Sequence, residues 1–396
     1  MTTKLQRLDQ LADSVTGQVI QWRRYLHEHP ELSFHEENTS QFVYDTLKSF
    51  GNIELSRPTK TSVMGRIVGT QPGKTLAIRA DMDALPIEER NDFPFASKNP
   101  GVMHACGHDG HTAMLLGTAK ILSEIKDQLK GEIRFFFQHA EELFPGGAEE
   151  MVDAGVMEGV DVIIGTHLWA PLEIGKIGIV YGPMMASPDT FYITIKGKGG
   201  HAALPHQTVD SIAIAAQVIT NLQHIISRQT DPLDNLVIST TKITGGTTHN
   251  VIPGSVELMG TVRCFEERLR KQVPEQMERI VKGITDAHGA AYDFKYQEGY
   301  RPVINDHEVT AMIEETACEV FGEEAVVRLP PNMGGEDFSA FQQKAPGNFF
   351  YIGAGNPDKN IIYPHHHERF TIDEEAMEKG VKMFVRAAFK FLNEKL

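Results

Sequence analysis

GEIRFFFQ at 131–138 is an apolar run of strand length, and with its flanking patterns it sets the class of fold. It follows DGHTAMLLGTAKILSEIK at 109–126, whose apolar residues recur at helical spacing and whose Asp109 is the expected N-cap. Two more short apolar runs, TLAIRA at 75–80 and DVIIGT at 161–166, lie on either side of these segments. This alternation predicts an α/β fold with a mixed, largely parallel sheet and helices on both faces.

A different pattern begins after about residue 186. Strand patterns at 189–197, 235–244, 255–262 and 290–297 are interleaved with helical patterns at 209–228 and 266–287. The order β-α-β-β-α-β is that of a ferredoxin-like α+β unit. We therefore expect one domain made of residues 1–185 and 298–396, interrupted by a second domain at 186–297.

Charge and composition exclude several classes of partner. The 396 residues include 38 Lys and Arg against 53 Asp and Glu, a formal net charge of −15, so neither nucleic acid nor an anionic membrane is the expected partner. No apolar run approaches the roughly 18 residues that a membrane span needs, and residues 1–15 lack a signal-peptide core. The three cysteines are too few for a disulfide framework, and we expect a cytoplasmic protein.

Five polar segments follow predicted strands, open helices or lie near the C-terminus. They are RADMDALP at 79–86, HACGHDGH at 104–111, QHAEELFPGG at 138–147, GTHLW at 165–169 and YPHHHERF at 363–370. The carboxyl ends of parallel strands meet at one edge of a sheet, where α/β proteins bind their ligands. These segments are therefore expected to meet there.

The segments contain donors suited to a metal centre. Cys106 and His108 are two residues apart in a glycine-containing loop, and Glu142, His167 and one histidine of 365–367 add further donors. Thiolate, imidazole and carboxylate donors suit zinc and its first-row neighbours. Five protein ligands are more than the three usual for one catalytic zinc. They predict two ions bridged by one ligand, for which Cys106 is the candidate.

Glu141 and Glu142 predict the chemistry at that centre. Because they are adjacent, their side chains are expected to diverge, so that one binds an ion and the other holds a water. A bound metal lowers the pKa of water from 15.7 to about 7, and a nearby carboxylate then acts as general base.

These segments also allow other interpretations. His104, His111 and His139 are expected to be structural, as single histidines usually are. A thiol protease built on Cys106 would leave the two glutamates and His167 without a role.

Motifs spread over nearly the whole chain resemble those of a known family. They are RRYLHEHPELSFHE at 23–36, RADMDALP, MHACGHDGHT, FQHAEE, GKGGHAALPH, HNVIPG, GTVRCF, MGGEDF and HHHERF. Together they resemble the zinc-peptidase superfamily of aminoacylases and carboxypeptidases, and most closely its N-acyl-amino-acid amidohydrolase and hippurate hydrolase branch. The resemblance implies a zinc-exopeptidase-like catalytic domain at 1–185 and 298–396, and a lid at 186–297 that forms homodimers in many members.

The resemblance also implies roles for residues of the first domain. By motif match Cys106 bridges the ions, and the remaining ligands are His108, Glu142, His167 and His366. Glu141 matches the general base, and Asp83 matches an aspartate that orients a ligand histidine. The commoner superfamily pattern has histidine in place of Asp81 and aspartate in place of Cys106. His139 replaces the usual proline.

In the lid, three positions match functional residues of the family. His201 matches a histidine that reaches a neighbouring subunit's site and stabilises the oxyanion. Asn250 and Arg263 match positions that bind the substrate carboxylate, for which the arginine fork is suited.

The implied activity is hydrolysis of an N-acyl amino acid (N-acetyl, N-benzoyl or related) by two divalent ions, zinc first, with manganese, cobalt or nickel as alternatives. Narrower alternatives are an N-acetyl-diaminopimelate deacetylase, a dipeptidase or a carboxypeptidase. A remote alternative is a non-catalytic metal-binding or peptide-binding protein, against which the retained Glu141 and Glu142 argue.

Overall fold

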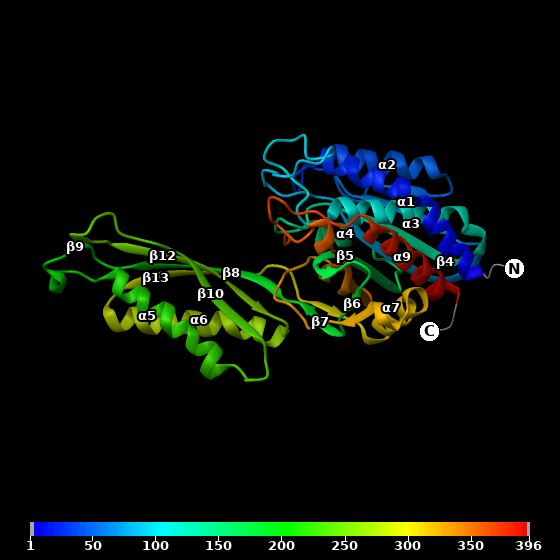
Figure 1. Cartoon of the computed structure of the whole chain (residues 1–396). Coiled ribbons are helices and arrows are strands. Elements are labelled where there is room, and N and C mark those ends of the chain that lie inside the picture. Colours follow the sequence, from blue (N-terminus) through cyan, green and yellow to red (C-terminus); the bar gives the residue numbers. More distant parts are fainter. Residues whose placement is uncertain (1–3, 394–396) are drawn as a thin grey trace. The chain divides into compact units, whose positions relative to one another are not determined.

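The computed structural model describes residues 4–393, which form two compact units (Figure 1). Of these residues, unit 1 contains 4–184, 304–331 and 337–393, and unit 2 contains Met185–Val303 and Asn332–Glu336. The predicted inserted range, 186–297, lies within unit 2. β7 (Gly182–Met185) and β14 (Val303–Asn305) are the strands at which the chain passes from one unit to the other.

Unit 1 is built on an eight-stranded sheet, in the order β1-β2-β4-β3-β5-β16-β6-β15. Its strands are β1 (Glu54–Ser56), β2 (Val63–Val68), β3 (Gln71–Asp81), β4 (Lys130–Gln138), β5 (Val162–Glu173), β6 (Ile177–Ile179), β15 (Val326–Arg328) and β16 (Gly347–Gly355). The four central strands, β4, β3, β5 and β16, run parallel. The predicted fold class is therefore confirmed.

Helices cover both faces of this sheet. They are α1 (Lys4–Glu28), α2 (Glu37–Phe50), α3 (His108–Glu124), α4 (Gly147–Asp153), α7 (His307–Phe321), α8 (Ser339–Gln342) and α9 (Glu375–Asn393), with short turns η1 (Lys126–Gln128), η4 (Glu323–Ala325) and η5 (Pro357–Lys359). Phe135 and Phe137 of β4 share a core with α1, α3 and α9, whereas Phe136 contacts Phe341 of α8. Successive strand residues point to opposite faces, so α8 lies on the face away from α3.

The strand register brings the polar segments to one edge of the sheet. Asp81, the last residue of β3, pairs with Gln138, the last residue of β4. Arg79 of β3 pairs with Gly165 of β5. β5 continues beyond the predicted 161–166 run, so His167 lies inside the strand. The ends of β3 and β4 therefore lie beside the middle of β5.

Unit 2 contains the elements β8 (Ser187–Lys196), β9 (Gly200–His201), η2 (Pro205–Gln207), α5 (Ser211–His224), η3 (Ile225–Gln229), β10 (Leu236–Thr244), β11 (Val251–Ile252), β12 (Ser255–Cys264), α6 (Glu267–His288) and β13 (Ala291–Gln297). Its antiparallel sheet has the order β10-β12-β8-β13, and α5 and α6 pack on one face of it (Figure 1). This is the predicted β-α-β-β-α-β order, with a small β9–β11 ribbon added at one end.

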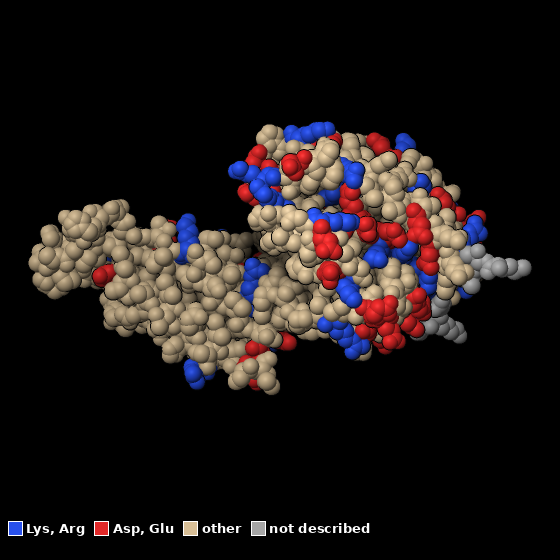
Figure 2. All heavy atoms as spheres, in the orientation of Figure 1, with Lys and Arg blue, Asp and Glu red and all other residues tan. Residues whose placement is uncertain are grey.

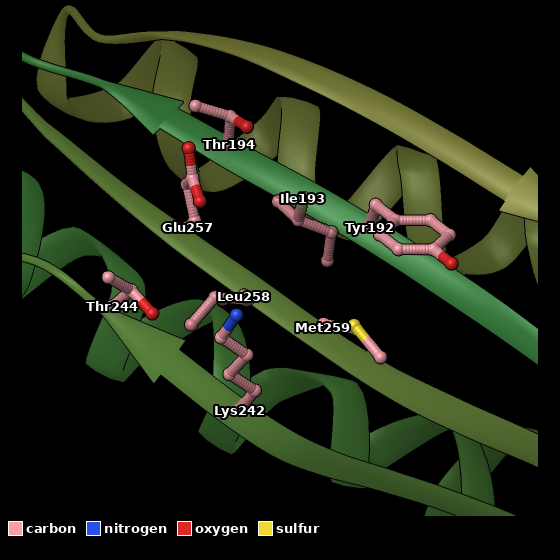
Figure 3. Close-up of a pocket in the computed structure, with 8 residues that line it drawn as sticks. All are labelled: Tyr192, Ile193, Thr194, Lys242, Thr244, Glu257, Leu258 and Met259. Carbon is pink, nitrogen blue, oxygen red and sulfur yellow. The ribbon is translucent and has the colours of Figure 1, made fainter.

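The other face of this sheet carries polar and large side chains. Met259 lies opposite Tyr192, and Glu257 lies opposite Thr194. These residues line a hollow of about 250 Å³ on the sheet (Figure 3).

On the visible face of unit 1, acidic and basic side chains are interspersed, whereas charges are sparse on the visible face of unit 2 (Figure 2). Within residues 4–393, no helix has both the length and the apolar character that a bilayer crossing requires.

Candidate metal centre

A short loop before α3 places two of the predicted donors side by side. Gly107 has φ +97°, in the left-handed region that favours glycine, and α3 begins at the next residue, His108. Cys106 Sγ lies 3.5 Å from His167 Nε2, on β5. The loop and the strand together bring Cys106, His108 and His167 within 4.8 Å of one another, measured between potential ligand atoms.

A second group of donors shares Cys106. Potential ligand atoms of Cys106, Glu142 and His366 also lie within 4.8 Å of one another. His366 Nε2 is 3.2 Å from Glu142 Oε1. The five residues predicted as ligands are thus brought together in unit 1, and Cys106 is common to both groups, as a bridging ligand would be.

Hydrogen bonds orient the two buried imidazoles. His108 Nδ1 is 3.0 Å from the carbonyl oxygen of Asp83 and 3.2 Å from its Oδ1, while His167 Nδ1 is 2.9 Å from the carbonyl oxygen of Leu168. In each ring the other nitrogen, Nε2, is the one near the remaining donors. An outer hydrogen bond of this kind fixes the ring of a metal-binding histidine.

Charge and burial act differently on the two histidines and the thiol. Burial lowers the pKa of His108, but the carboxylates of Asp81, Asp83 and Glu142 outweigh burial and raise this pKa to about 10. Burial holds the pKa of His167 well below its usual value, so its ring is neutral at pH 7. Burial and the nearby carboxylates Glu142 and Glu141 hold the pKa of Cys106 well above the usual thiol value.

These features fit divalent cations. His108 Nε2 is buried and has no hydrogen-bond partner among the described residues, although donors of both groups surround it. A cation would pair with that nitrogen and favour the ionised Cys106 thiol, since metal ligands bind in their deprotonated forms. The donors, sulfur, imidazole nitrogen and carboxylate oxygen, are those of zinc and related ions.

Glu141 and Glu142 do not diverge as expected. Glu141 Oε2 and Glu142 Oε1 each lie 3.9 Å from His108 Nε2. Adjacent side chains alternate only in a strand, and here β4 has ended and Ala140 has φ +50°. Both carboxylates therefore reach the same region.

Asp83 connects these parts of the centre. Besides contacting His108, its carboxylate accepts hydrogen bonds from Ser33 Oγ at 2.7 Å and from the backbone N–H of Glu142 at 3.0 Å. The aspartate predicted to orient a histidine thus also holds the loop that carries the two glutamates.

The expected role of Asp109 as N-cap is wrong. Gly107 occupies the cap position, and Asp109 is the second residue of α3. Its buried carboxylate instead accepts hydrogen bonds from Arg23 Nε and His27 Nδ1, each at 2.8 Å. The carboxylate is committed to this ion pair with α1.

The histidines expected to be structural are buried among other groups. His111 bridges Asp81, 2.7 Å from its Oδ1, and the backbone N–H of Leu168. His139 lies between Glu150 and Thr59, with Nε2 3.1 Å from Glu150 Oε2. His104 is buried, and burial lowers its pKa to about 4.

His365 also lies at the centre, although it was not among the predicted ligands. Its Nδ1 is 3.8 Å from Cys106 Sγ, its Nε2 accepts from the N–H of Ala170, and its ring stacks on Trp169. The only sequence signal was its place in the 365–367 histidine run, which did not separate it from His366.

The predicted lid residues lie in unit 2. His201 ends β9, and Asn250 accepts from the N–H of Ala202 through its backbone carbonyl. Both are exposed. Arg263 is half-buried near the end of β12, and its Nη1 donates to the carbonyl of Met333.

His201, in the β9–β11 ribbon, and Arg263, in β12, lie at opposite ends of unit 2. Residue 255 of β12 pairs with residue 196, five positions before His201, while Arg263 pairs with Pro188. The eight steps between these pairs span roughly 26 Å at ~3.3 Å per residue.

Comparisons with known proteins show the family of the chain. The family model described as peptidase family M20/M25/M40 matches residues 77–390. An N-acyl-L-amino acid amidohydrolase of Geobacillus stearothermophilus is 72% identical over 300 residues, which are 76% of this chain and 81% of that protein. Thermostable carboxypeptidase 1 of Saccharolobus solfataricus is 45% identical over 379 residues, 95% of this chain and 96% of that one.

A solved structure is similar over nearly the whole of this chain. It is a dinuclear metal binding peptidase of the M20 family from Bacillus subtilis, with a TM-score of 0.84 and 40% identity over 97% of this chain and 100% of that chain.

Proposed function

The chain belongs to peptidase family M20/M25/M40, and from this we propose that it is a metal-dependent amidohydrolase that cleaves N-acyl amino acids. The products are a carboxylic acid and a free amino acid. The observation that carries the proposal is the pair of donor groups that share Cys106, with the Glu141 carboxylate beside them.

We assign the ions to the two donor groups. One is held by Cys106, His108 and His167, and the other by Cys106, Glu142 and His366. When bound, such ions polarise the amide carbonyl and make water acidic enough to be deprotonated near pH 7. Zinc is the first choice for these donors, with manganese, cobalt or nickel as alternatives.

Glu141 acts as the general base and then as the general acid. Its carboxylate lies within 3.9 Å of His108 but is not needed in either donor group. It takes a proton from the attacking water and returns it to the leaving amine.

Arg263 of one copy and Asn250 of the other bind the substrate carboxylate, because Asn250 lies next to His201. His201 donates a hydrogen bond to the oxyanion. Because His201 in the β9–β11 ribbon and Arg263 in β12 lie at opposite ends of unit 2, one small substrate cannot touch both in the same copy. The protein therefore acts as a homodimer, in which His201 of one copy serves the centre of the other.

The substitution Glu141→Gln tests the catalytic assignment. It keeps the shape of the side chain but removes the base, so turnover of N-acetyl-methionine should fall at least about 1,000-fold. Metal content, measured by elemental analysis, should stay as in the wild type. Glu149→Gln, on the exposed side of α4, is the matched control and should change neither value. Near-normal turnover of Glu141→Gln would refute the assignment.

Mixed dimers test the shared site. Glu141→Gln and His201→Ala proteins should each be inactive alone. After subunit exchange, half of the dimers carry one of each copy, and each of these has one intact site, so about a quarter of wild-type activity should return. If exchange is verified by mass and no activity returns, each copy supplies its own His201.

The carboxypeptidase alternative is kept because of the 45% identical relative of that name. Rates on N-acetyl-methionine, hippurate, N-acetyl-diaminopimelate and a dipeptide, with the enzyme stripped and reloaded with each metal, rank the substrates and the ions together. We place the protein in the cytoplasm, since its three cysteines are free in the structure.

A further inference from the structure

We propose that Glu36 is a positioning residue that holds the loop bearing Glu141 in its working conformation. Glu36 lies more than a hundred residues before that loop, and nothing in the metal centre uses it as a ligand. Its effect on turnover rests on the proposed function, whereas its effect on the loop does not.

The carboxylate of Glu36 is joined directly to the loop. Its Oε1 accepts hydrogen bonds from the backbone N–H of Ala140 at 2.8 Å and from that of Phe34 at 3.0 Å. Its Oε2 accepts from Thr61 Oγ1 at 3.0 Å. The side chain is 0% exposed, so water does not compete for these bonds.

The loop needs such an anchor because of its backbone. Ala140 has φ +50° and Phe34 has φ +68°, a region that costs a non-glycine residue about 1–2 kcal/mol. Both strained residues donate their N–H groups to the same oxygen of Glu36. That oxygen therefore compensates for the strain at both sites.

Asp83 supplies a second anchor on the other side of Glu141. Its Oδ2 accepts from the N–H of Glu142, while Glu36 accepts from the N–H of Ala140. The residues before and after the general base are thus fixed by two buried carboxylates. Glu141 is held between them, and its carboxylate is aimed at the region of His108.

An ordinary structural role does not account for Glu36. It occupies the position before α2, yet its side chain makes no capping hydrogen bond to that helix. Glu31 caps α2 instead, accepting from the N–H groups of Asn38 and Thr39. Burial and the charge of Asp83 raise the pKa of Glu36 to about 7, a cost that a side chain serving only to fill space would avoid.

Four variants test the proposal. Glu36→Leu removes the acceptors, Glu36→Gln keeps an oxygen for the two N–H groups and an amide for Thr61, and Thr61→Val removes one anchor only. Glu31→Ala is the matched control, because it weakens the cap of α2 without touching residues 140–142. Each variant is measured for kcat and KM on N-acetyl-methionine, bound metal, thermal stability and, after chelation, hydrogen exchange of the peptide covering 138–145.

Glu36→Leu should lower kcat about 100-fold with KM within about threefold, as expected for a displaced base, and should keep its metal. Hydrogen exchange at 138–145 should rise in Glu36→Leu, and to a smaller extent in Thr61→Val, but not in Glu31→Ala. Glu36→Gln should recover kcat to within about fivefold of the wild type, since its oxygen still accepts both bonds. If Glu36→Leu does not fold, the hydrogen exchange and the kcat of Thr61→Val and Glu36→Gln decide whether the proposal holds.

The proposal fails if exchange at 138–145 is unchanged in Glu36→Leu and Thr61→Val. It also fails if Glu36→Gln is as slow as Glu36→Leu, or if Glu31→Ala lowers kcat equally. A wild-type protein without hydrolase activity would refute the proposed function alone, because the exchange result on the metal-free protein is independent of turnover.

Discussion

Ala140 and His366 show what the residue-level pattern could and could not predict. The motifs predicted which side chains meet, because donors at strand ends of one sheet must converge. The motifs did not predict the direction in which each side chain points. His366 has φ +65°, and its ring lies near Glu142, whereas the ring of His365 contacts Cys106. A left-handed backbone at a non-glycine residue leaves no mark in the sequence, so the convergence of Glu141 and Glu142 was missed.

Glu36 also makes the stability of the protein depend on pH. Burial and Asp83 raise its pKa from 4.5 to about 7 in the folded protein. Below pH 4.5 Glu36 is neutral in the folded and in the unfolded protein. As pH rises from 4.5 toward 7, the unfolded protein loses the Glu36 proton while the folded protein keeps it, so the free energy of unfolding falls. Above pH 7 the folded state buries a charge at a cost of at most about 3 kcal/mol.

Glu36→Gln should therefore gain thermal stability over the wild type as pH rises. The difference between their melting temperatures, measured on chelated protein, should be larger at pH 8 than at pH 5. Glu37→Gln, at the neighbouring exposed position, is the control and should show no such growth. A difference that is constant with pH would contradict the raised pKa.

At the scale of elements, long periodic segments were predicted well and short ones were not. The helical pattern at 266–287 predicted α6, whose buried face repeats every four residues from Leu269 to Thr285. The strands β1, β6 and β15 were not predicted, since three residues show no period. The 14-residue helix α2 was also not predicted. The start of α3 was misplaced because Asp109, a good cap by type, is paired with Arg23.

Gly117 shows how tightly α3 packs between α1 and α9. A Cβ at this position would lie 2.7 Å from Val19 Cγ2 and 3.2 Å from Val381 Cγ2. Gly117→Ala should thus destabilise unit 1 by about 1–3 kcal/mol despite the better helix propensity of alanine. Gly17→Ala, in α1 with nothing within 4 Å, should instead stabilise it by about 0.5–1 kcal/mol. Denaturant unfolding measures both, and equal signs would contradict the packing argument.

At the scale of the whole molecule, the chain has two separate apolar cores. One lies under α1, α3 and α9, and the other lies between α5, α6 and the unit 2 sheet. The sequence pattern changes near residue 186, and unit 2 begins at Met185. Residues 332–336 group with unit 2, because Gly334 accepts from Ala186 and Met333 from Arg263. The sequence of such a short segment does not indicate which distant residues it contacts, so its place in unit 2 could not be predicted.

Two cores predict two unfolding transitions. Both tryptophans, Trp22 in α1 and Trp169 in β5, belong to unit 1, so tryptophan fluorescence reports that unit, while circular dichroism reports both. Chelation should lower the temperature of the transition seen by fluorescence, since ions at a thousand times their Kd stabilise the protein that binds them by about 4 kcal/mol. A second transition, seen by circular dichroism, should keep its temperature. A single transition that both probes follow together, with and without chelator, would contradict this.

The donors of the centre come from both sides of the interruption in unit 1. Cys106, His108, Glu142 and His167 precede the inserted unit, and His366 follows it. Under the proposed ligand set, each metal-bound centre therefore cross-links the two separated stretches of unit 1. Removing the cations would release the segment around His366, which is exposed. A protease should therefore cleave the metal-free protein first in the turn around His366.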